Sequence, residues 1–246
     1  MPAQLTRRDE AMLEWLAVVR VADVHAIRYA LAGFAGSPDP VTMRRAQQWI
    51  LRMLGTGLVG RARPTFRDES IVWVTREAFG QRPPNLFQQT ARHEVAVAAA
   101  SARYVAQGYS WARDRKPSGL LDHQADGVAR RGDVLELIEV EMTQKTRGRY
   151  RVICDSHAFR MEHEGVTRVT YLCTPAASRS VAREADRFLH PTHRSRLITL
   201  DVFDGHGRVV GDLGPLWEPI LQSMPRSGQV ELSGFDRPFD QRGQLR

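Results

Sequence analysis

The residues of this chain best suited to chemistry are three carboxylates in the stretch "DGVARRGDVLELIEVEMTQK" at 126–145. Asp126 precedes a short turn, and Glu139 and Glu141 stand one residue apart in a run of large apolar side chains. Three oxygen donors that converge at one end of a sheet form a hard-cation site, for which Mg²⁺ (or Mn²⁺) is best suited. The alternative is a half-exposed strand whose glutamates face water.

Side-chain alternation along this stretch favours a buried strand. Leu135 and Leu137 share one face with the two glutamates, whereas Ile138 and Val140 point the other way. Apolar residues on both faces indicate a central strand that is covered on each side. Two carboxylates side by side in such a strand repel each other and lose hydration, so we expect a cation to compensate them.

The elements around this strand alternate between helices and strands. The pattern predicts helices over 86–107, 147–165 and 177–189 and strands over 109–115, 120–130, 134–142, 166–174 and 196–203. This order implies an α/β domain with a mixed sheet flanked by helices. Residues 223–246 have no apolar period and read as a loose C-terminal tail.

The first eighty residues have a different order. Helical spacing predicts helices over 7–20 and 24–31 and a third that begins with Asp39 as cap and Pro40 at its first position. A two-stranded hairpin follows between 58 and 79. Three helices and a hairpin are the order of a winged helix-turn-helix.

The third of these helices has the composition of a DNA-contacting element. We expect Met43, Ala46, Ile50 and Leu54 to face the core. The outward residues are then donors suited to phosphates and base edges: Thr42, Arg44, Arg45, Gln48 and Arg52. Arg61, Arg63 and Arg67 would lie on or near the wing. Residues 1–82 hold 12 arginines against 8 acidic residues, a net charge of +4. Double-stranded DNA is therefore the expected partner, and dimerisation or protein docking through this face is the alternative.

Together these patterns predict an α+β chain of two domains. The first is the winged helix-turn-helix at 1–82, the second the α/β domain at 86–222, and "GQRPPN" at 80–85 is the linker. The net charge of +7 suits a polyanionic partner. No apolar run is long enough to span a membrane, and no signal peptide is evident, so we expect no membrane partner and a cytoplasmic location.

Cysteine and histidine motifs give no zinc pattern. Cys154 and Cys173 are too few for a disulfide framework and read as packed thiols. "CDSH" at 154–157 and "HPTH" at 190–193 contain metal-binding residue types, but neither has a matching second pair. Lys116 and Lys145 are the only lysines among 35 basic residues, which suggests that an ammonium is wanted at each.

The pattern of an aspartate followed by glutamates on the next strand resembles the PD-(D/E)XK nuclease superfamily. Over roughly residues 5–190 the chain is similar to the actinobacterial replication-relaxation family, which joins a winged helix to a nuclease-like domain. The similar segments are "RHEVAVAAASARY", "WARDR", "DHQADGV" and "IEVEMTQKTRGRY".

The resemblance implies roles for several residues. Asp126, Glu139 and Glu141 would be the metal ligands, and Glu141 or Lys145 would orient the attacking water. Glu94 resembles the additional acidic residue of many such enzymes, and His93 and His123 would touch metal-bound water or phosphate. Two departures stand out: Ala125 replaces the usual proline, and Glu141 occupies the place of the lysine.

The expected function is thus a DNA-binding protein of a mobile element or its host, with an Mg²⁺-dependent endonuclease or nickase domain. The alternative is a non-catalytic DNA-binding factor for replication, transfer or transcription, whose nuclease-like domain is a binding platform. A homodimer or a complex with a replication or transfer protein fits either reading.

Overall fold

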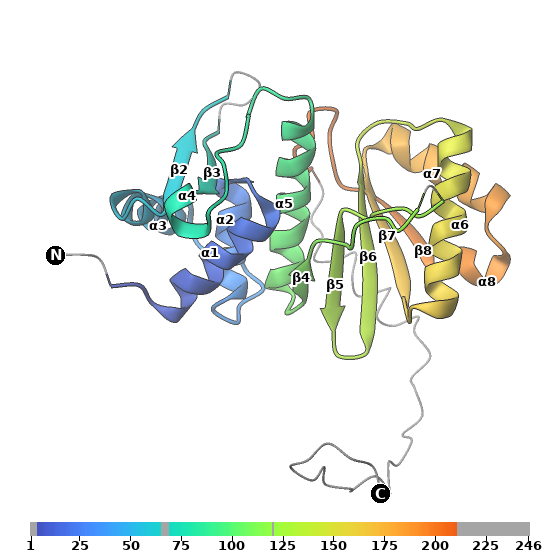
Figure 1. Ribbon diagram of the computed structural model, residues 1–246, viewed down its shortest axis with the longest axis horizontal. Coiled ribbons are helices and arrows are strands. Elements are labelled where there is room, and N and C mark those ends of the chain that lie inside the picture. Colours follow the sequence, from blue (N-terminus) through green and yellow to red (C-terminus); the bar gives the residue numbers. More distant parts are fainter. Residues whose placement is uncertain (1–3, 65–68, 120, 211–246) are drawn as a thin grey trace, which may run out of the picture. The chain divides into compact units, whose positions relative to one another are not determined.

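The computed structural model describes residues 4–64, 69–119 and 121–210. These described residues form one compact unit. Its elements, labelled in Figure 1, are α1 (Arg7–Val19), β1 (Ala22–Asp23), α2 (Val24–Gly33), α3 (Met43–Gly55), β2 (Val59–Ala62), β3 (Ile71–Val74), α4 (Arg76–Phe79), α5 (Thr90–Ala106), β4 (Ser110–Ala112), β5 (Gly127–Arg131), β6 (Val134–Glu141), α6 (Arg147–His163), β7 (Arg168–Cys173), α7 (Pro175–Phe188), α8 (Pro191–Arg194) and β8 (Leu197–Asp201). No helix in the described ranges is long and apolar enough to cross a membrane.

The first helices begin where side chains cap them. Thr6 accepts the amide hydrogen of Asp9, and the Asp9 carboxylate accepts the amide hydrogen of Thr6, which closes a capping box at α1. Asp23 caps α2 by accepting the Ala26 amide at 2.8 Å, as expected. The expected start of α3 was wrong: Thr42, not Asp39, is its cap, since the Thr42 hydroxyl accepts the Arg45 amide.

A three-stranded sheet in the order β1-β3-β2 lies beside these helices. The strand β1, two residues long, was not expected because so short a segment has no period to detect. The inward face of α3 also differs from expectation. Trp49 and Met53 are buried along with Ala46 and Ile50, whereas Met43 and Leu54 only border the core.

The larger sheet is five-stranded and mixed, in the order β4-β5-β6-β7-β8. β4, β5 and β6 pair antiparallel, and β6, β7 and β8 pair parallel. The expected position of residues 134–142 as a central strand is confirmed: β6 is the middle strand, and all six residues from Glu136 to Glu141 are buried. The helices and mixed sheet confirm the α+β class.

Helices cover both faces of this sheet (Figure 1). On one face α6 and α7 pack against Leu137 and Tyr171. On the other face Tyr104 of α5 donates a hydrogen bond to Glu136 at 2.8 Å. Leu137 and Glu136 therefore point in opposite directions, which confirms the expected alternation. Glu139 and Glu141 belong to the α6/α7 face.

The expected linker at 80–85 does not divide the chain into separate compact units. The α5 helix, assigned to the second domain, packs Ala98, Ala102 and Val105 into the core of the first helices. Trp15 of α1 also donates to Ser101 of α5 at 2.9 Å. The described parts of the two expected domains, 1–82 and 86–222, thus belong to one unit. The expected tail at 223–246 lies outside the described residues.

Candidate functional site

Glu139 and Glu141, two of the expected metal ligands, are buried on β6. The side chain of Glu139 is 6% exposed and that of Glu141 is 4% exposed. Burial of a carboxylate without compensation is unfavourable, so each must have a partner. The structure supplies these partners from the protein itself, and they differ for the two residues.

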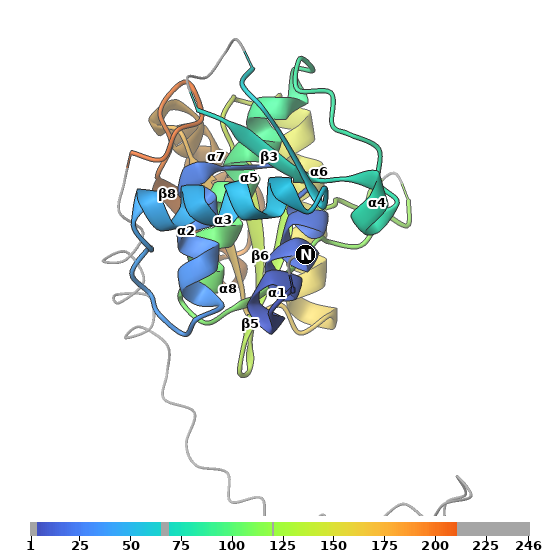
Figure 2. The same cartoon turned by 90° about the vertical axis from the view of Figure 1, so that its left-hand side faces the viewer.

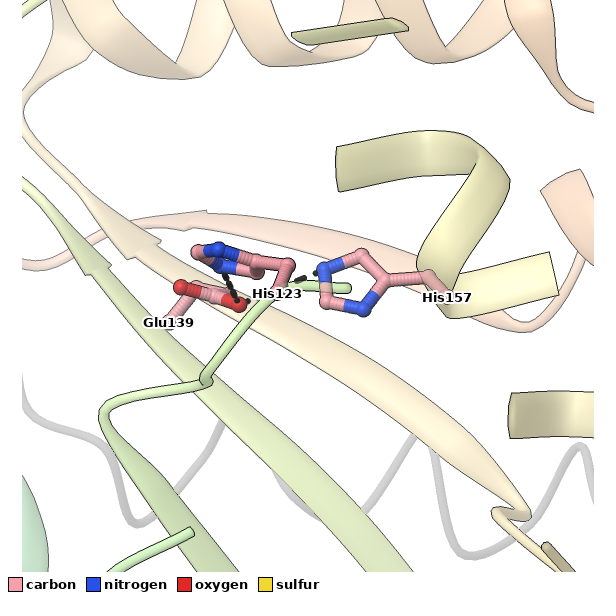
Figure 3. A group of neighbouring side chains, drawn as sticks. All are labelled: His123, Glu139 and His157. Carbon is pink, nitrogen blue, oxygen red and sulfur yellow. Dashed lines mark hydrogen bonds and ion pairs between the residues drawn. The ribbon is translucent and has the colours of Figure 1, made fainter. Parts of the chain in front are cut away.

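Two histidines hold Glu139 (Figure 3). The Nε2 atom of His123 donates to Oε1 of Glu139 at 2.8 Å, and the Nε2 atom of His157 lies 3.3 Å from the same oxygen. His123 lies in the segment that leads into β5, and His157 lies on α6. Burial raises the pKa of Glu139, but the hydrogen bonds from His123 and His157 outweigh it and hold that pKa well below its usual range.

His157 is completely buried and lies 3.2 Å from the Tyr171 hydroxyl. Burial lowers its pKa below the ordinary value, although the Glu139 carboxylate opposes this in part. His157 is therefore neutral near pH 7. Its Nδ1 atom is buried and has no hydrogen-bond partner among the described residues.

The side chain of Lys145 reaches back to β6, the strand that precedes it in the chain. Its ammonium bonds the carboxylate of Glu141, so this lysine lies beside one of the two glutamates of β6. Burial lowers the pKa of Lys145, while the negative charges of Glu139 and Asp126 raise it in part. The compensating cation for Glu141 is thus a side chain of the chain itself.

Asp126 lies just before β5 and has two partners of its own. Its Oδ1 atom is 2.8 Å from Nε2 of His93 on α5, and its Oδ2 atom accepts the Val140 amide at 2.8 Å. Burial lowers the pKa of His93, but the hydrogen bond to Asp126 and the negative charges of Asp126 and Glu94 together outweigh it, and the net shift is upward. Asp126 and His93 are the more accessible pair, with side chains 23% and 34% exposed.

The structure does not gather the expected metal ligands Asp126, Glu139 and Glu141 into one three-ligand group. Each bonds a different protein partner: Asp126 contacts His93, Glu139 contacts His123 and His157, and Glu141 pairs with Lys145. Among the described residues, the group of three donors that lies close enough to hold a metal ion is His123, Glu139 and His157.

Sequence reasoning assigned no role to His157. Its partners Glu139 and His123 are 18 and 34 positions away, so no short motif joins them. The "CDSH" segment at 154–157 is the local signal for this histidine, and it lacks a second local pair. Only the packing of α6 on β6 makes that pair.

Glu94 does not join the other carboxylates either. Its carboxylate accepts a hydrogen bond from Arg113 at 2.5 Å and lies 3.6 Å from the guanidinium of Arg20. Arg113 also donates to the Val18 carbonyl at 2.7 Å. Glu94 thus belongs to an ion-pair network that ties α5 and the segment after it to the end of α1.

The expected DNA-contacting residues of α3 divide into two groups. Arg44, Arg45 and Gln48 are exposed, and their side chains form no ion pair or hydrogen bond with other described residues. Figure 2 shows α3 running across the near side of the molecule. These three residues keep their donors available for a ligand.

Thr42 and Arg52 have structural partners instead. The Thr42 hydroxyl caps α3. The Arg52 guanidinium bonds the fully buried carboxylate of Asp9, with Nη1 3.0 Å from Oδ2. Arg61 and Arg63 are exposed at β2 and just after it, whereas Arg67 lies outside the described residues.

The two cysteines are free and buried, as expected for packed thiols. Burial raises the pKa of Cys154 and of Cys173 to about 12, so neither thiol is reactive at neutral pH.

Comparison with protein-family models, with curated proteins and with solved structures gives no match to this chain. The resemblance to the replication-relaxation family therefore stays a prediction, and the proposals below depend on the geometry of the chain.

Proposed function

We propose that this chain is a double-stranded DNA-binding protein whose α3 contacts the DNA. The observation that carries the proposal is the exposed face of α3. There Arg44, Arg45 and Gln48 have no partners among the described residues. Guanidinium and amide groups in this state suit phosphate oxygens and the edges of bases.

The elements around α3 support this proposal. Three helices precede the β2–β3 pair, the order of a winged helix-turn-helix. The opposite side of α3 is anchored in the core by Trp49, Ile50 and Met53, so the helix is rigid enough to present its outer face. Arg61 and Arg63 add exposed positive charge at the strand that would form the wing.

A salt titration tests the proposal. Binding to a fluorescent DNA duplex is measured by anisotropy at several salt concentrations. If Arg44 and Arg45 bind phosphates, log K falls linearly with log[salt], and alanine at either position reduces the slope by about 1. Arg179→Ala is the matched control, because it removes the same charge from the exposed surface of α7. Equal losses in all three variants would show that α3 is not the DNA contact. No salt-dependent binding would instead favour docking of α3 onto a protein.

In this proposal the five-stranded sheet and the helices that cover it serve as a non-catalytic binding platform. The specific observation is that Asp126, Glu139 and Glu141 each bond a protein donor. Because the protein itself supplies these partners, the three carboxylates do not require an added cation. Replication, transfer and transcription factors are the classes of DNA-binding protein that fit such an arrangement.

Metal-dependent cleavage of the phosphodiester backbone is the second candidate function. One observation favours it: Lys145 returns to Glu141 and also lies in the field of Asp126 and Glu139, so an ammonium stands beside the acidic residues. The arrangement of Asp126, Glu139 and Glu141 fits Mg²⁺ poorly. That ion requires an octahedron of oxygens, whereas these carboxylates face histidine and lysine donors.

Nicking of supercoiled plasmid in Mg²⁺ or Mn²⁺ decides between the two candidates. Cleavage by wild type that is lost in both Asp126→Asn and Glu139→Gln would establish the nuclease. Plasmid that stays intact, together with the salt-dependent binding described above, supports the non-catalytic protein. Arg45→Ala is a useful companion variant, since it should weaken DNA delivery without altering the carboxylates.

A further inference from the structure

We propose that His123, Glu139 and His157 form a binding site for one transition-metal dication, of the class of Zn²⁺, Fe²⁺ or Co²⁺. The three residues come from three different segments and meet in the interior between β6 and α6 (Figure 3). The inference does not depend on DNA binding by α3. It shares Glu139 and His123 with the residues expected at the nuclease site.

The spacing of the donor atoms matches the coordination sphere of such an ion. Metal–ligand bonds of about 2.0–2.1 Å place neighbouring ligand atoms about 2.9–3.4 Å apart in octahedral or tetrahedral geometry. The two histidine nitrogens lie 2.8 and 3.3 Å from Oε1 of Glu139. All three ligand atoms lie within 4.8 Å of one another, so small shifts of the side chains would seat the ion.

The chemistry of the donors selects the metal. Two imidazoles and one carboxylate are the ligand set of zinc and of ferrous iron, whereas Mg²⁺ prefers oxygen ligands alone. The site is therefore different in kind from the Mg²⁺ site that the sequence predicts at Asp126, Glu139 and Glu141.

Arg149 competes with the metal through His123. Its Nη2 atom donates to Nδ1 of His123 at 3.3 Å, so Nδ1 is an acceptor there and the ring proton on Nε2 points at Glu139. Metal binding at Nε2 moves that proton to Nδ1, where it faces the Arg149 donor. Arg149 is exposed and free to turn into water. Its removal should therefore strengthen metal binding.

The metal affinity also depends on what the other ring nitrogen of each histidine bonds. Metal-binding histidines usually donate their other N–H group to a carboxylate or carbonyl oxygen. Here Nδ1 of His157 has no partner among the described residues, and Nδ1 of His123 faces a donor. We expect the affinity to be about 10–100-fold below that of sites that have such acceptors.

Titration of the metal-free full chain with Zn²⁺, and with Co²⁺ followed by its visible absorption, tests the proposal. Wild type should bind one ion of either metal and bind Mg²⁺ much more weakly. His123→Gln and His157→Gln should each lose about tenfold or more in affinity. Arg149→Gln should gain about tenfold, because the charged donor that faces Nδ1 of His123 is removed. His206→Gln, an exposed histidine outside the group, is the control and should match wild type.

The histidine variants should weaken metal binding, whereas Arg149→Gln should strengthen it. The test therefore stays decisive even if a buried histidine variant does not fold. In that case the rise in Tm on adding Zn²⁺ is compared between wild type and Arg149→Gln, and a larger rise in the variant supports the site. Metal affinity unchanged in Arg149→Gln, or lost only in Asp126→Asn and Glu141→Gln, would overturn it. The second of these results would point to the carboxylate site of the nuclease candidate.

Discussion

Arg52 lies on the same helix as the arginines proposed to contact DNA, but its environment predicts a different role. Its guanidinium bonds the carboxylate of Asp9, a fully buried residue of α1. We therefore expect Arg52→Ala to lower the free energy of unfolding and to leave DNA affinity close to that of wild type. Arg45→Ala should show the reverse pattern.

The size of the stability loss follows from what remains around Asp9. Removing one partner of a fully buried ion pair costs about 3–5 kcal/mol. The Arg52 side chain is 38% exposed, however, and Asp9 keeps its hydrogen bond from Nε1 of Trp49 at 2.8 Å. Solvent therefore screens part of the lost interaction, and we expect about 1.5–3 kcal/mol.

The same pair gives a pH dependence. Burial raises the pKa of Asp9, but the hydrogen bonds from Arg52 and Thr6 outweigh it and hold that pKa below its ordinary value of 3.8. A depressed carboxyl pKa stabilises the fold above the unfolded value, and that contribution is lost as the pH falls through the folded value. The difference between wild type and Arg52→Ala should thus be full at neutral pH and shrink below pH 3.8.

Urea unfolding followed by circular dichroism at neutral pH measures the free energy of unfolding. Anisotropy with a fluorescent DNA duplex measures the DNA affinity. The midpoint of unfolding should fall in Arg52→Ala while the slope m stays constant. Suppose instead that Arg52→Ala weakens DNA binding as much as Arg45→Ala and unfolds within about 0.5 kcal/mol of wild type. Then Arg52 would belong to the DNA-contacting face, and the reasoning from its bond to Asp9 would be refuted.

Three further changes test other parts of the structure. Lys145→Met leaves Glu141 buried without its cation and should lower the free energy of unfolding by about 2–4 kcal/mol; adding Glu141→Gln should recover part of the loss in urea, and no recovery would contradict the pairing. Burial lowers the pKa of His157 below its ordinary 6.5, so its contribution is present above that pH and is lost on acidification. Wild type should therefore lose more stability than His157→Gln between about pH 7 and 5 in denaturant titrations. Gly127→Ala would place a methyl group 2.0 Å from Cζ2 of Trp111 and should cost about 1–3 kcal/mol, a loss that Trp111→Leu in the same chain should reduce in thermal unfolding.

Most of the helices and strands follow from signals that act between residues close together in the sequence. Apolar spacing and the caps at Thr6 and Asp23 predict α1 and α2, because these signals act within a few residues. Alternation on both faces of 134–142 predicts a central strand, which β6 is. The misplaced start of α3 has a local cause too. Two capping residues, Asp39 and Thr42, precede that helix, and the spacing alone does not choose between them.

The partners of the charged groups were decided by the tertiary structure. Sequence alone indicated that buried carboxylates on β6 require compensation, and it favoured a divalent ion. The fold instead brings His123 and His157 to Glu139 and brings Lys145 back to Glu141. The pairing of Glu139 with His157 depends on how α6 packs on the sheet, which no residue spacing records.

The same limit explains why five outward positions on α3 did not have one role. Helical periodicity determined which side chains point away from the core, and Arg44, Arg45 and Gln48 do so without partners among the described residues. Whether an exposed arginine is available for DNA depends on what lies opposite it. Arg52 faces the buried carboxylate of Asp9, 43 positions earlier in the chain, because α1 packs beside α3. Composition and period thus determined the elements and their faces, and only the three-dimensional contacts decided which charges remain available for a ligand.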